Sequence, residues 1–359
     1  MAQDAAAQDA HADVTVLLDG KKVEESSFVG FRIERDMYQP DHATIEVSNQ
    51  GSAHAGHKVG DSVEIKIGDG ADSLFKGQIT GLSPLFKGGG DTKITIQAMN
   101  KLHKLVRGRH SKTFQDKTDQ QIISEVVQSA GLTLEWKHDQ TITYKHVYQH
   151  NQTNLEFLRM RAARLGCHIW CVDTKVFVKQ PDLGASQALE LHCDKAGSGE
   201  PVRWFRPKLD SSGIVKKVTV RGWDPEKKEE IVGEASIASS PLASKNASAA
   251  SNDLGNEETF IVDQPIWSKQ EANAIAKAKL TDAALSYITG DVEIAGNSKV
   301  DLGKSIKITV KSDANDPFSG KYYVMGIVHT NRVEKKQGGK GGDGGFHTQL
   351  RLARDGQDS

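Results

Sequence analysis

The cysteines and their histidine neighbours come nearest to a set of residues that could do chemistry. The segment CHIWC places Cys167 and His168 before Cys171, and Cys193 follows His192. Zinc prefers thiolate and imidazole ligands, but structural zinc sites take them as tight pairs from short turns. The two thiols of CHIWC alternate on one face of a predicted strand, so we expect them to pack in a core. The sequence therefore predicts no metal and no cofactor.

A second group, His42, His54 and His57, lies in or near a loop rich in glycine and alanine. No carboxylate or nucleophile stands at a spacing that would make a catalytic pair with them, so we expect solvated loop histidines. The motifs of the nucleophile elbow, the P-loop, the zinc-protease helix and the dinucleotide-binding turn do not occur. The runs GGGD and GGKGGDGG are poor phosphate cradles because no helix N-terminus follows them. We predict no catalytic residue and no enzymatic activity.

The charge balance argues against a general affinity for nucleic acid or membranes. The 46 basic and 47 acidic residues leave a net charge of −1, which creates no long-range field for polyanions. The basic cluster at 101–112 could hold phosphate, but a positive rim facing a protein partner or a solvated linker is the favoured interpretation. No window approaches the roughly 20 apolar residues of a membrane span. We predict neither specific nucleic-acid binding nor membrane insertion.

The first residues and the cysteine usage indicate where the chain is made. Residues 1–13 lack the basic and apolar regions of a secretion signal, and we expect them to form a disordered leader. Three cysteines are an odd and sparse set, which fits folding in a reducing compartment without a disulfide framework. The expectation is synthesis in the cytoplasm without a signal peptide.

Short alternating strands dominate both ends of the chain. Segments such as SVEIKI and TKITIQA place apolar residues on one face and polar residues on the other. Residues 14–110 hold six such strands and predict a first antiparallel barrel. Residues 206–235 plus 286–355 predict a second, discontinuous barrel. A low-complexity loop and an alanine-rich helix, residues 236–285, interrupt it.

Between these regions, residues 111–205 carry helical signals. Thr118 and Gln121 have the spacing of a capping box, and Gly131 stops the helix. A second helix begins at Thr153 or Asn154 and is followed by two strands. The sequence therefore predicts a β-rich α+β protein with two antiparallel β-barrels and an α+β region between them.

The segment TVRGWDPEKKEEIVGEA stands out because a tryptophan and an aspartate lie among many charges. The Trp-Asp pair occurs once and is not a propeller repeat. The segment predicts a hairpin with Asp224 and Pro225 in the turn. The internal repeat and the family resemblance given below imply that it opens the second barrel, with Trp223 covering a barrel end.

An internal repeat links the two predicted barrels. Residues 59–77 align without a gap on residues 302–320, with Gly60 on Gly303 and Gly77 on Gly320. Matching order, spacing and following elements indicate duplication. We expect these four glycines to set the turns that both barrels share.

Three stretches together resemble the phage late control gene D family, the baseplate hub proteins of contractile tails, which are related to the hub part of type VI secretion VgrG proteins. FQDKTDQQIISEVVQSAGL resembles the family's helix after the first barrel. YQHNQTNLEFLRMRAARLGCHIWCVDTKVFV resembles its next helix and hairpin. VRWFRPKLDSSGIVKKVTVRGWDPEKKEEIVGEA and FSGKYYVMGIVHT resemble its second barrel. The resemblance covers residues 14–355.

This resemblance implies tail-tube-like barrels and a homotrimer that presents six quasi-equivalent barrels, adapting a sixfold inner tube to a threefold spike. The implied partners are the chain itself, the inner tube protein, a spike protein, the baseplate wedge proteins and a cargo or tape-measure protein. VgrG chains usually continue into a spike, whereas this sequence stops at Ser359, so we expect a separate spike polypeptide. The glycine loop containing Gly338, Gly341 and Gly345 is a candidate contact with tube or spike.

The implied location is the baseplate of a phage tail, a tailocin or an extracellular contractile particle. Two alternatives remain open from the residues. One is a tail-tip cell-wall hydrolase, which would need paired carboxylates or a zinc set in a cleft. The other is a receptor- or carbohydrate-binding tail module, which would need exposed aromatic platforms.

Overall fold

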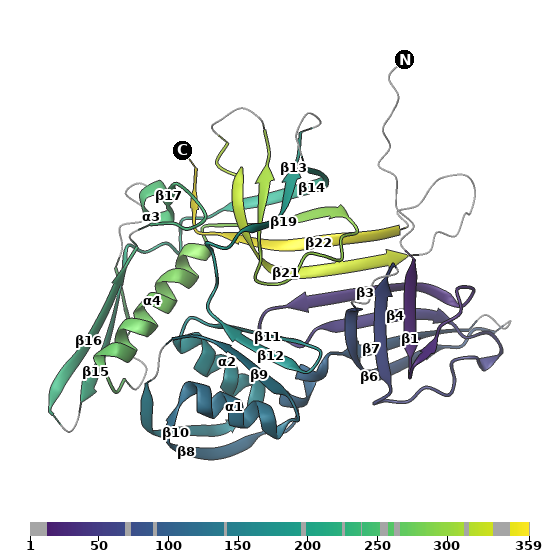
Figure 1. Ribbon diagram of the computed structural model, residues 1–359, viewed down its shortest axis with the longest axis horizontal. Helices are drawn as coiled ribbons and strands as arrows, with labels where there is room; N and C mark the ends of the chain where they lie inside the picture. The colour runs from purple at the N-terminus through teal and green to yellow at the C-terminus, as the bar shows by residue number, and fades with distance from the viewer. Residues whose placement is uncertain are drawn as a thin grey trace.

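The computed structural model of this chain describes residues 13–68, 73–88, 92–139, 142–194, 199–224, 227–237, 239–251, 258–261, 266–311, 316–332 and 345–358. These ranges fold into four units, each with its own cluster of buried apolar side chains. Figure 1 shows the units side by side, with the N-terminal sheet at the right and the C-terminal barrel above the others.

The first unit is an antiparallel sheet with the strand order β2-β1-β5-β6-β7-β4-β3. Its elements are β1 (Val14–Leu18), β2 (Lys21–Lys22), β3 (Phe28–Asp36), β4 (His42–Ser48), the 3₁₀ turn η1 (Gln50–Ser52), β5 (Ser62–Ile67), β6 (Ser73–Leu85), β7 (Lys93–Met99) and the 3₁₀ turn η2 (Lys101–Leu105). Ile33, Ile45 and Ile96 are fully buried, because alternate residues of a strand face the same side. The six predicted strands are present.

This sheet does not complete the first predicted barrel. Closure would require the end strands β1 and β3 to pair, and among the described residues they do not. The sheet instead wraps around one core that includes Val16 from β1 and Phe31 from β3. Of the two predicted barrels, the structure shows one closed barrel and, in place of the other, one open sheet.

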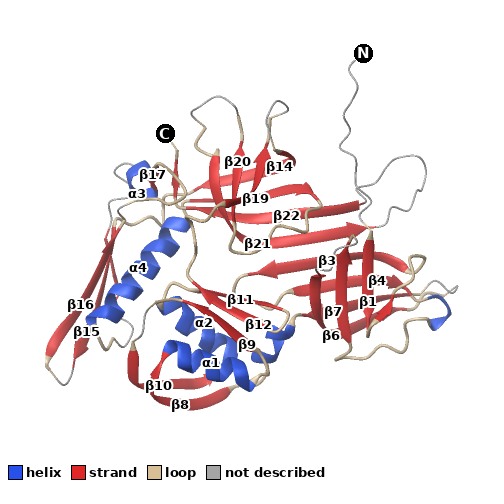
Figure 2. Ribbon diagram, viewed as in Figure 1, coloured by secondary structure: helices blue, strands red, loops and turns tan. Residues whose placement is uncertain are grey.

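The second unit is the α+β region. It contains β8 (His110–Thr118), α1 (Asp119–Ser129), β9 (Thr133–Lys137), β10 (Thr143–Gln152), α2 (Asn154–Arg164), β11 (His168–Val172) and β12 (Lys175–Lys179). Figure 2 shows α1 and α2 between the β8–β10 pair and the β11-β12-β9 sheet. Both helices begin with a capping box, Thr118 with Gln121 and Thr153 with Glu156, which confirms the two predicted helix starts.

The third unit is a closed barrel of six strands. They are β13 (Gln187–His192), β14 (Glu200–Leu209), β19 (Ile288–Ala295), β20 (Ser305–Thr309), β21 (Gly320–Arg332) and β22 (Gly345–Arg354). The ring runs β13-β20-β21-β22-β19-β14 and closes from β14 to β13. Because β13 pairs in parallel with both β14 and β20, the barrel is mixed and not purely antiparallel. Its first two strands come largely from residues that the sequence placed in the α+β region.

The fourth unit corrects the position of the Trp-Asp hairpin. β15 (Lys217–Asp224), β16 (Glu229–Ser236) and β18 (Glu258–Ile261) form a separate sheet, against which α4 (Lys269–Leu285) packs (Figure 1). Gly233 allows this approach, since a Cβ there would lie 2.4 Å from the carbonyl carbon of Ala272. The hairpin buries Val220 and Ile231 against α4, so this apolar face packs on the helix and not in the barrel.

The short elements β17 (Lys245–Asn246), α3 (Ala247–Ala250) and β23 (Gly356–Gln357) lie beside the barrel. β17 pairs antiparallel with β23. Residues 236–285, predicted as one insertion, are therefore divided between the hairpin unit and this small pair of strands.

Candidate assembly surfaces

The N-terminal sheet and the barrel have the same strand order. Numbered along the chain, the six strands β1, β3, β4, β5, β6 and β7 lie in the order first, fourth, fifth, sixth, third, second. The strands β13, β14, β19, β20, β21 and β22 lie in that order too. The predicted sequence repeat falls on the fourth and fifth strands of each set. The repeat of one hairpin thus extends to five strands that match in order and direction, which supports duplication of a module. The first strands differ in direction, because β1 pairs antiparallel with β5 and β13 pairs parallel with β20.

The four glycines of the repeat have different structural roles. Gly60 and Gly303 lie in turns just before β5 and β20, with φ of +102° and +75°, a region that favours glycine. Gly77 lies inside β6 and not in a turn. A Cβ there would lie 2.4 Å from the carbonyl oxygen of Met99, so close backbone packing and not turn geometry requires this glycine.

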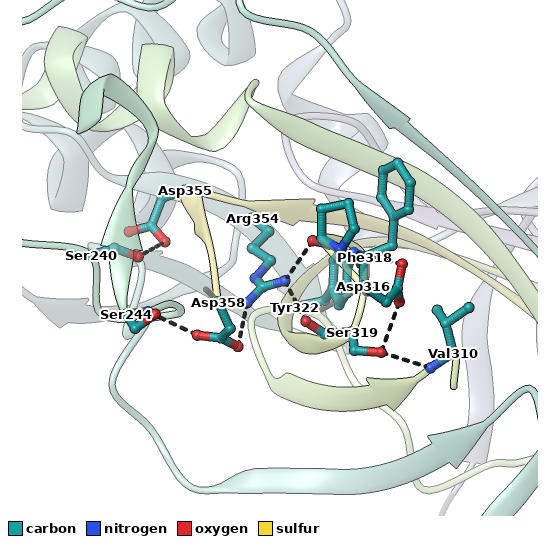
Figure 3. A network of polar contacts seen from close by, with 11 residues as sticks. Ser240, Ser244, Val310, Asp316, Phe318, Ser319, Tyr322, Arg354, Asp355 and Asp358 are labelled. Atoms are coloured by element: carbon teal, nitrogen blue, oxygen red, sulfur yellow. Dashed lines mark hydrogen bonds and ion pairs between the residues drawn. The ribbon is translucent and has the colours of Figure 1, made fainter. Parts of the chain in front are cut away.

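Gly320 opens β21 and packs directly on a buried guanidinium. Its φ is +141°, and a Cβ there would lie 2.2 Å from Nη2 of Arg354. Arg354 donates hydrogen bonds to the carbonyl oxygens of Pro317 (3.3 Å) and Ser319 (2.7 Å) and pairs with Asp358 (2.7 Å). Figure 3 shows Arg354 between Ser319 and Asp358. Arg354 therefore ties the start of the β21 hairpin to the C-terminal end of the described chain.

A ladder of main-chain hydrogen bonds, which we call the intrachain seam, joins the two modules. β3 pairs antiparallel with β21 from Gly326 opposite Asp36 to Arg332 opposite Gly30. This pairing makes one thirteen-stranded sheet of the N-terminal sheet and the barrel. At the centre of the seam Ile33 and His329 are fully buried.

Charged and polar side chains surround the intrachain seam. Arg351 forms an ion pair with Asp36 at 2.5 Å. His329 Nδ1 lies 3.0 Å from Thr348 Oγ1, and burial lowers the pKa of His329 to about 3. The imidazole is therefore neutral at physiological pH.

The turn between β3 and β4 locks the N-terminal sheet to the other units. The Tyr38 backbone N–H donates to the Ile169 carbonyl oxygen at 2.7 Å, and the Tyr38 ring meets His168 edge-on at 5.3 Å. Met37 is fully buried in the barrel's core cluster. His168 Nδ1 lies 3.0 Å from the Tyr323 hydroxyl. Sequence reasoning missed His168 as a buried link because it considered only metal binding.

A polar cleft of about 690 Å³ opens beside this junction. In its wall Arg35 pairs with Asp301 at 2.8 Å and with Asp41 at 3.4 Å. Burial outweighs the attraction of Arg35 and raises the pKa of Asp41 to about 6. Asn100 Nδ2 donates to the Cys171 carbonyl oxygen at 3.0 Å. The cleft thus holds an ionic and hydrogen-bonded anchor between three units.

The residues of the predicted hairpin site do not form a cluster. Trp223 is 59% exposed and covers no barrel end, so that expectation is wrong. Asp224 Oδ1 accepts a hydrogen bond from the Lys227 backbone N–H at 3.1 Å, and Pro225 lies outside the described residues. Nearby, Phe260 is 56% exposed, with the Arg221 guanidinium 5.6 Å above its ring.

The candidate assembly loop lies mostly where the structure gives no description. Gly338 and Gly341 are outside the described residues. Gly345 is the first residue of β22, with φ of +97°. The contact of this loop with a tube or spike stays a prediction.

The predicted packing of the thiols is present. Cys167 and Cys171 are buried in the core of the α+β unit, where burial raises both pKa values to about 12. Over the described ranges no three His, Cys, Asp or Glu side chains are grouped to hold a metal ion. None of the helices in these ranges is both long and apolar enough to cross a bilayer.

The sequence of the chain matches a known family profile. The family described as the Alg8 N-terminal domain matches residues 13–332. The chain belongs to this family. No curated protein has a matching sequence.

The fold of this chain also occurs in solved structures of other proteins. The 43 kDa tail protein of prophage MuSo2 from Shewanella oneidensis is 12% identical, with a TM-score of 0.70 over 96% of this chain and 98% of that one. A tail protein from Neisseria meningitidis MC58 is 15% identical, with a TM-score of 0.70 over 96% of each chain.

A third structure belongs to a secretion system. The Escherichia coli c3393 protein is described as a type VI secretion component with structural similarity to the phage T4 tail proteins gp27 and gp5. It is 11% identical, with a TM-score of 0.61 over 94% of this chain and 76% of that one. The predicted resemblance to phage tail and VgrG-like hub proteins is confirmed in the fold.

Proposed function

We propose that this protein is a non-enzymatic structural hub at the base of the inner tube of a contractile tail or injection particle. One observation carries the proposal. Two modules of the same strand order follow each other in one chain and are joined by the intrachain seam. The fold shared with phage tail proteins and with a type VI secretion component supports the same role.

The joint between the modules is heterologous. The second strand of the first module, β3, pairs with the fifth strand of the second module, β21. Such head-to-tail contacts form a ring when the rotation closes. Three copies would present six related modules around one axis, and this number adapts a sixfold tube to a threefold spike.

The proposed partners are those that the resemblance to baseplate hub proteins implies. One face of the trimeric ring would meet the inner tube protein and the opposite face a spike protein. The units outside the ring would face the baseplate wedge proteins. A cargo or tape-measure protein would occupy the lumen. The protein would act within a virion-like or extracellular particle.

The test is the mass and symmetry of the assembled protein. We expect light scattering to give three times the chain mass of 39.1 kDa, and electron-microscopy class averages to show a threefold ring with six lobes at one level. A monomer at tens of micromolar, both alone and after co-expression with its tube and spike proteins, would overturn the proposal.

A further inference from the structure

Resting on the proposed ring, we propose that β14 of one copy pairs antiparallel with β6 of the next copy. We call this the intercopy seam. It would repeat between copies the β3–β21 joint that exists within one chain. The occupant of each free edge is thus a second copy of this chain.

The register of the intercopy seam follows from matching positions in the two modules. Gly81 in β6 and Gly326 in β21 each follow a break in strand register and pair with Gln97 and Arg351, respectively. Both glycines pack against that partner, since an added Cβ would lie 2.8 Å from Gln97 Oε1 and 3.2 Å from Arg351 Cζ. In the structure Gly81 therefore corresponds to Gly326, two residues beyond Val324, on which the gapless sequence alignment places it.

The same ladder identifies the other half of the joint. From Gln97 the pairing passes through Thr44 to Arg32. From Arg351 it passes through Asp291 to Arg206. Arg32 in β3 therefore corresponds to Arg206 in β14.

The intrachain seam places Thr330 opposite Arg32 and Val328 opposite Glu34. Transferred to the equivalent strands, this register places Leu85 opposite Arg206 and Ser83 opposite Lys208. It also sets Leu82 against Leu209 and Phe86 against Phe205.

The two edges are free in the described chain. β14 pairs with β19 on one side, and on the other it meets β13 only at Glu200 and Pro201. β6 pairs with β7 through Leu85, while its pairing with β5 ends at Gln78. The portions needed for the intercopy seam, residues 204–209 and 82–85, have no other strand partner among the described residues.

The main-chain groups of β14 point in the required direction. The Asp210 N–H donates to the Tyr287 carbonyl oxygen at 2.9 Å. Because these groups alternate along an antiparallel strand, Lys208 and Arg206 also face β19. Phe205 and Leu209 then present their main-chain groups to the free edge.

In the intrachain seam, the residues that direct their main-chain groups toward the partner strand alternate in the same way. The Met37 N–H donates to the Met325 carbonyl oxygen at 3.4 Å, so alternation makes Ile327 and Asn331 face β3. These two residues correspond to Leu82 and Phe86. The outward-facing residues of β6 and β14 therefore meet in the proposed register.

The exposed fractions of the side chains differ between the intrachain seam, where both strands are paired, and the strand edges proposed for the intercopy seam. On β21, Ile327 is 1% exposed and Asn331 is 8% exposed. Their counterparts in the first module are Leu82 in β6, which is half-buried, and Phe86, which directly follows β6 and is 75% exposed. Across the seam Leu209 is 39% exposed. The first module thus leaves apolar side chains in solvent at positions that its duplicate buries against a neighbouring strand.

Prolines occupy the middle of both free edges. Pro84 and Pro207 fall opposite each other in the proposed register, so the pairs on either side carry the main-chain hydrogen bonds. Proline is tolerated at edge positions, and it interrupts the row of donors that would recruit unrelated strands. The free edges are therefore guarded against indiscriminate pairing before assembly.

A disulfide placed across the intercopy seam tests the register. Ser83 and Lys208 form a pair of the non-hydrogen-bonded type, with Cα atoms about 4.5 Å apart in an antiparallel ladder, within disulfide range. Ser83→Cys and Lys208→Cys would be combined with Cys193→Ser, because Cys193 is the exposed native thiol. Under a mild thiol oxidant we expect covalent dimers and closed covalent trimers on non-reducing gels.

The matched control moves one cysteine by two residues. Ser83→Cys with Arg206→Cys shifts the thiol by about 6.8 Å along the strand, and Arg206 is as exposed as Lys208. We expect cross-linking at least about tenfold weaker, since that separation lies outside disulfide geometry. Melting temperatures equal to the parent protein would show that both variants fold.

The outcomes separate the two proposals. A trimer by light scattering that forms no 83–208 cross-link would refute the intercopy seam and leave the hub function standing. Equal cross-linking of the shifted pair would refute the register. A protein that neither cross-links nor trimerises, both alone and after co-expression with its tube and spike proteins, would refute the hub and the seam together.

Discussion

The Arg354 guanidinium occupies the space that a side chain at Gly320 would need, because a Cβ there would lie 2.2 Å from Arg354 Nη2. The two residues come from β22 and β21, adjacent strands of the barrel. The sequence repeat pointed to Gly320 but did not show why this position requires a glycine. The reason is that a fully buried arginine ties this hairpin to the C-terminal end of the described chain.

Gly320→Ala should therefore destabilise the barrel. We expect a loss of about 3 kcal/mol, combining backbone strain at φ of +141° with displacement of Arg354. The matched control is Gly60→Ala, where φ is +102° and a Cβ would meet nothing within 4 Å. That variant should lose only the strain of about 1–2 kcal/mol. Equal urea midpoints for the two variants would show that the Arg354 contact contributes nothing.

Trp223→Ala should leave the fold intact. The ring is 59% exposed, and exposed substitutions usually change stability by less than about 0.5 kcal/mol. Ile231→Ala in the same hairpin is the comparison, because Ile231 packs in the α4 core and should cost about 2–4 kcal/mol. Thermal melts of both variants check this. A large loss for Trp223→Ala would mean that the ring is buried in the solution state.

The buried histidines should make the fold sensitive to acid. Burial lowers the pKa of His168 to about 4 and of His329 to about 3, below the ordinary value of about 6.5. The unfolded chain therefore binds more protons than the folded chain between these values. Stability should fall as pH drops below about 6.5.

His329→Gln should flatten this acid response. The variant removes one titrating group from the intrachain seam and leaves His168 in place. The measurement is the melting temperature from pH 7 to pH 4, with the exposed His150→Gln as control. An unchanged slope in His329→Gln would show that His329 titrates normally.

Asp41 should affect the pH dependence of stability in the opposite direction to the buried histidines. Its folded pKa is raised to about 6 from an ordinary value of about 3.9, so its contribution to stability is lost as pH rises through that interval. Relative to the parent protein, Asp41→Asn should gain about 2–3 kcal/mol on going from pH 4 to pH 7.5. Urea unfolding at both pH values tests this, and a pH-independent difference would contradict it. Asp173→Asn, a half-exposed carboxyl in the same cleft, serves as control.

Local patterns predicted the strands and helices well. The alternating segments of the first module and both helix starts appear where the sequence placed them, the first helix with its predicted capping box. Capping and alternation are encoded by residues within one turn or strand, so a single sequence reveals them. The structure also shows equivalent turns at Gly60 and Gly303, because both positions have a positive φ.

Strand neighbours could not be predicted in the same way. β13 and β14 close the barrel through a short parallel contact, and nothing in either strand specifies its partner. The expected place of the Trp223 hairpin in the barrel rested on the internal repeat and the family resemblance, and neither specifies the elements that the hairpin contacts. Gly222 and Gly233, which allow Ile266 and α4 to approach, were the overlooked signal. The free edges at Phe86 and Leu209 are identified by comparison with the pairing of β3 and β21, and the sequence does not indicate that pairing.

β21 also determines how the molecule would respond to force. It pairs with β20, β22 and β3, so the N-terminal sheet and the barrel share a strand ladder and not only a flexible tether. A push or twist applied to one module would load the intrachain seam in shear, across several hydrogen bonds at once. The two modules should therefore behave as one stiff body.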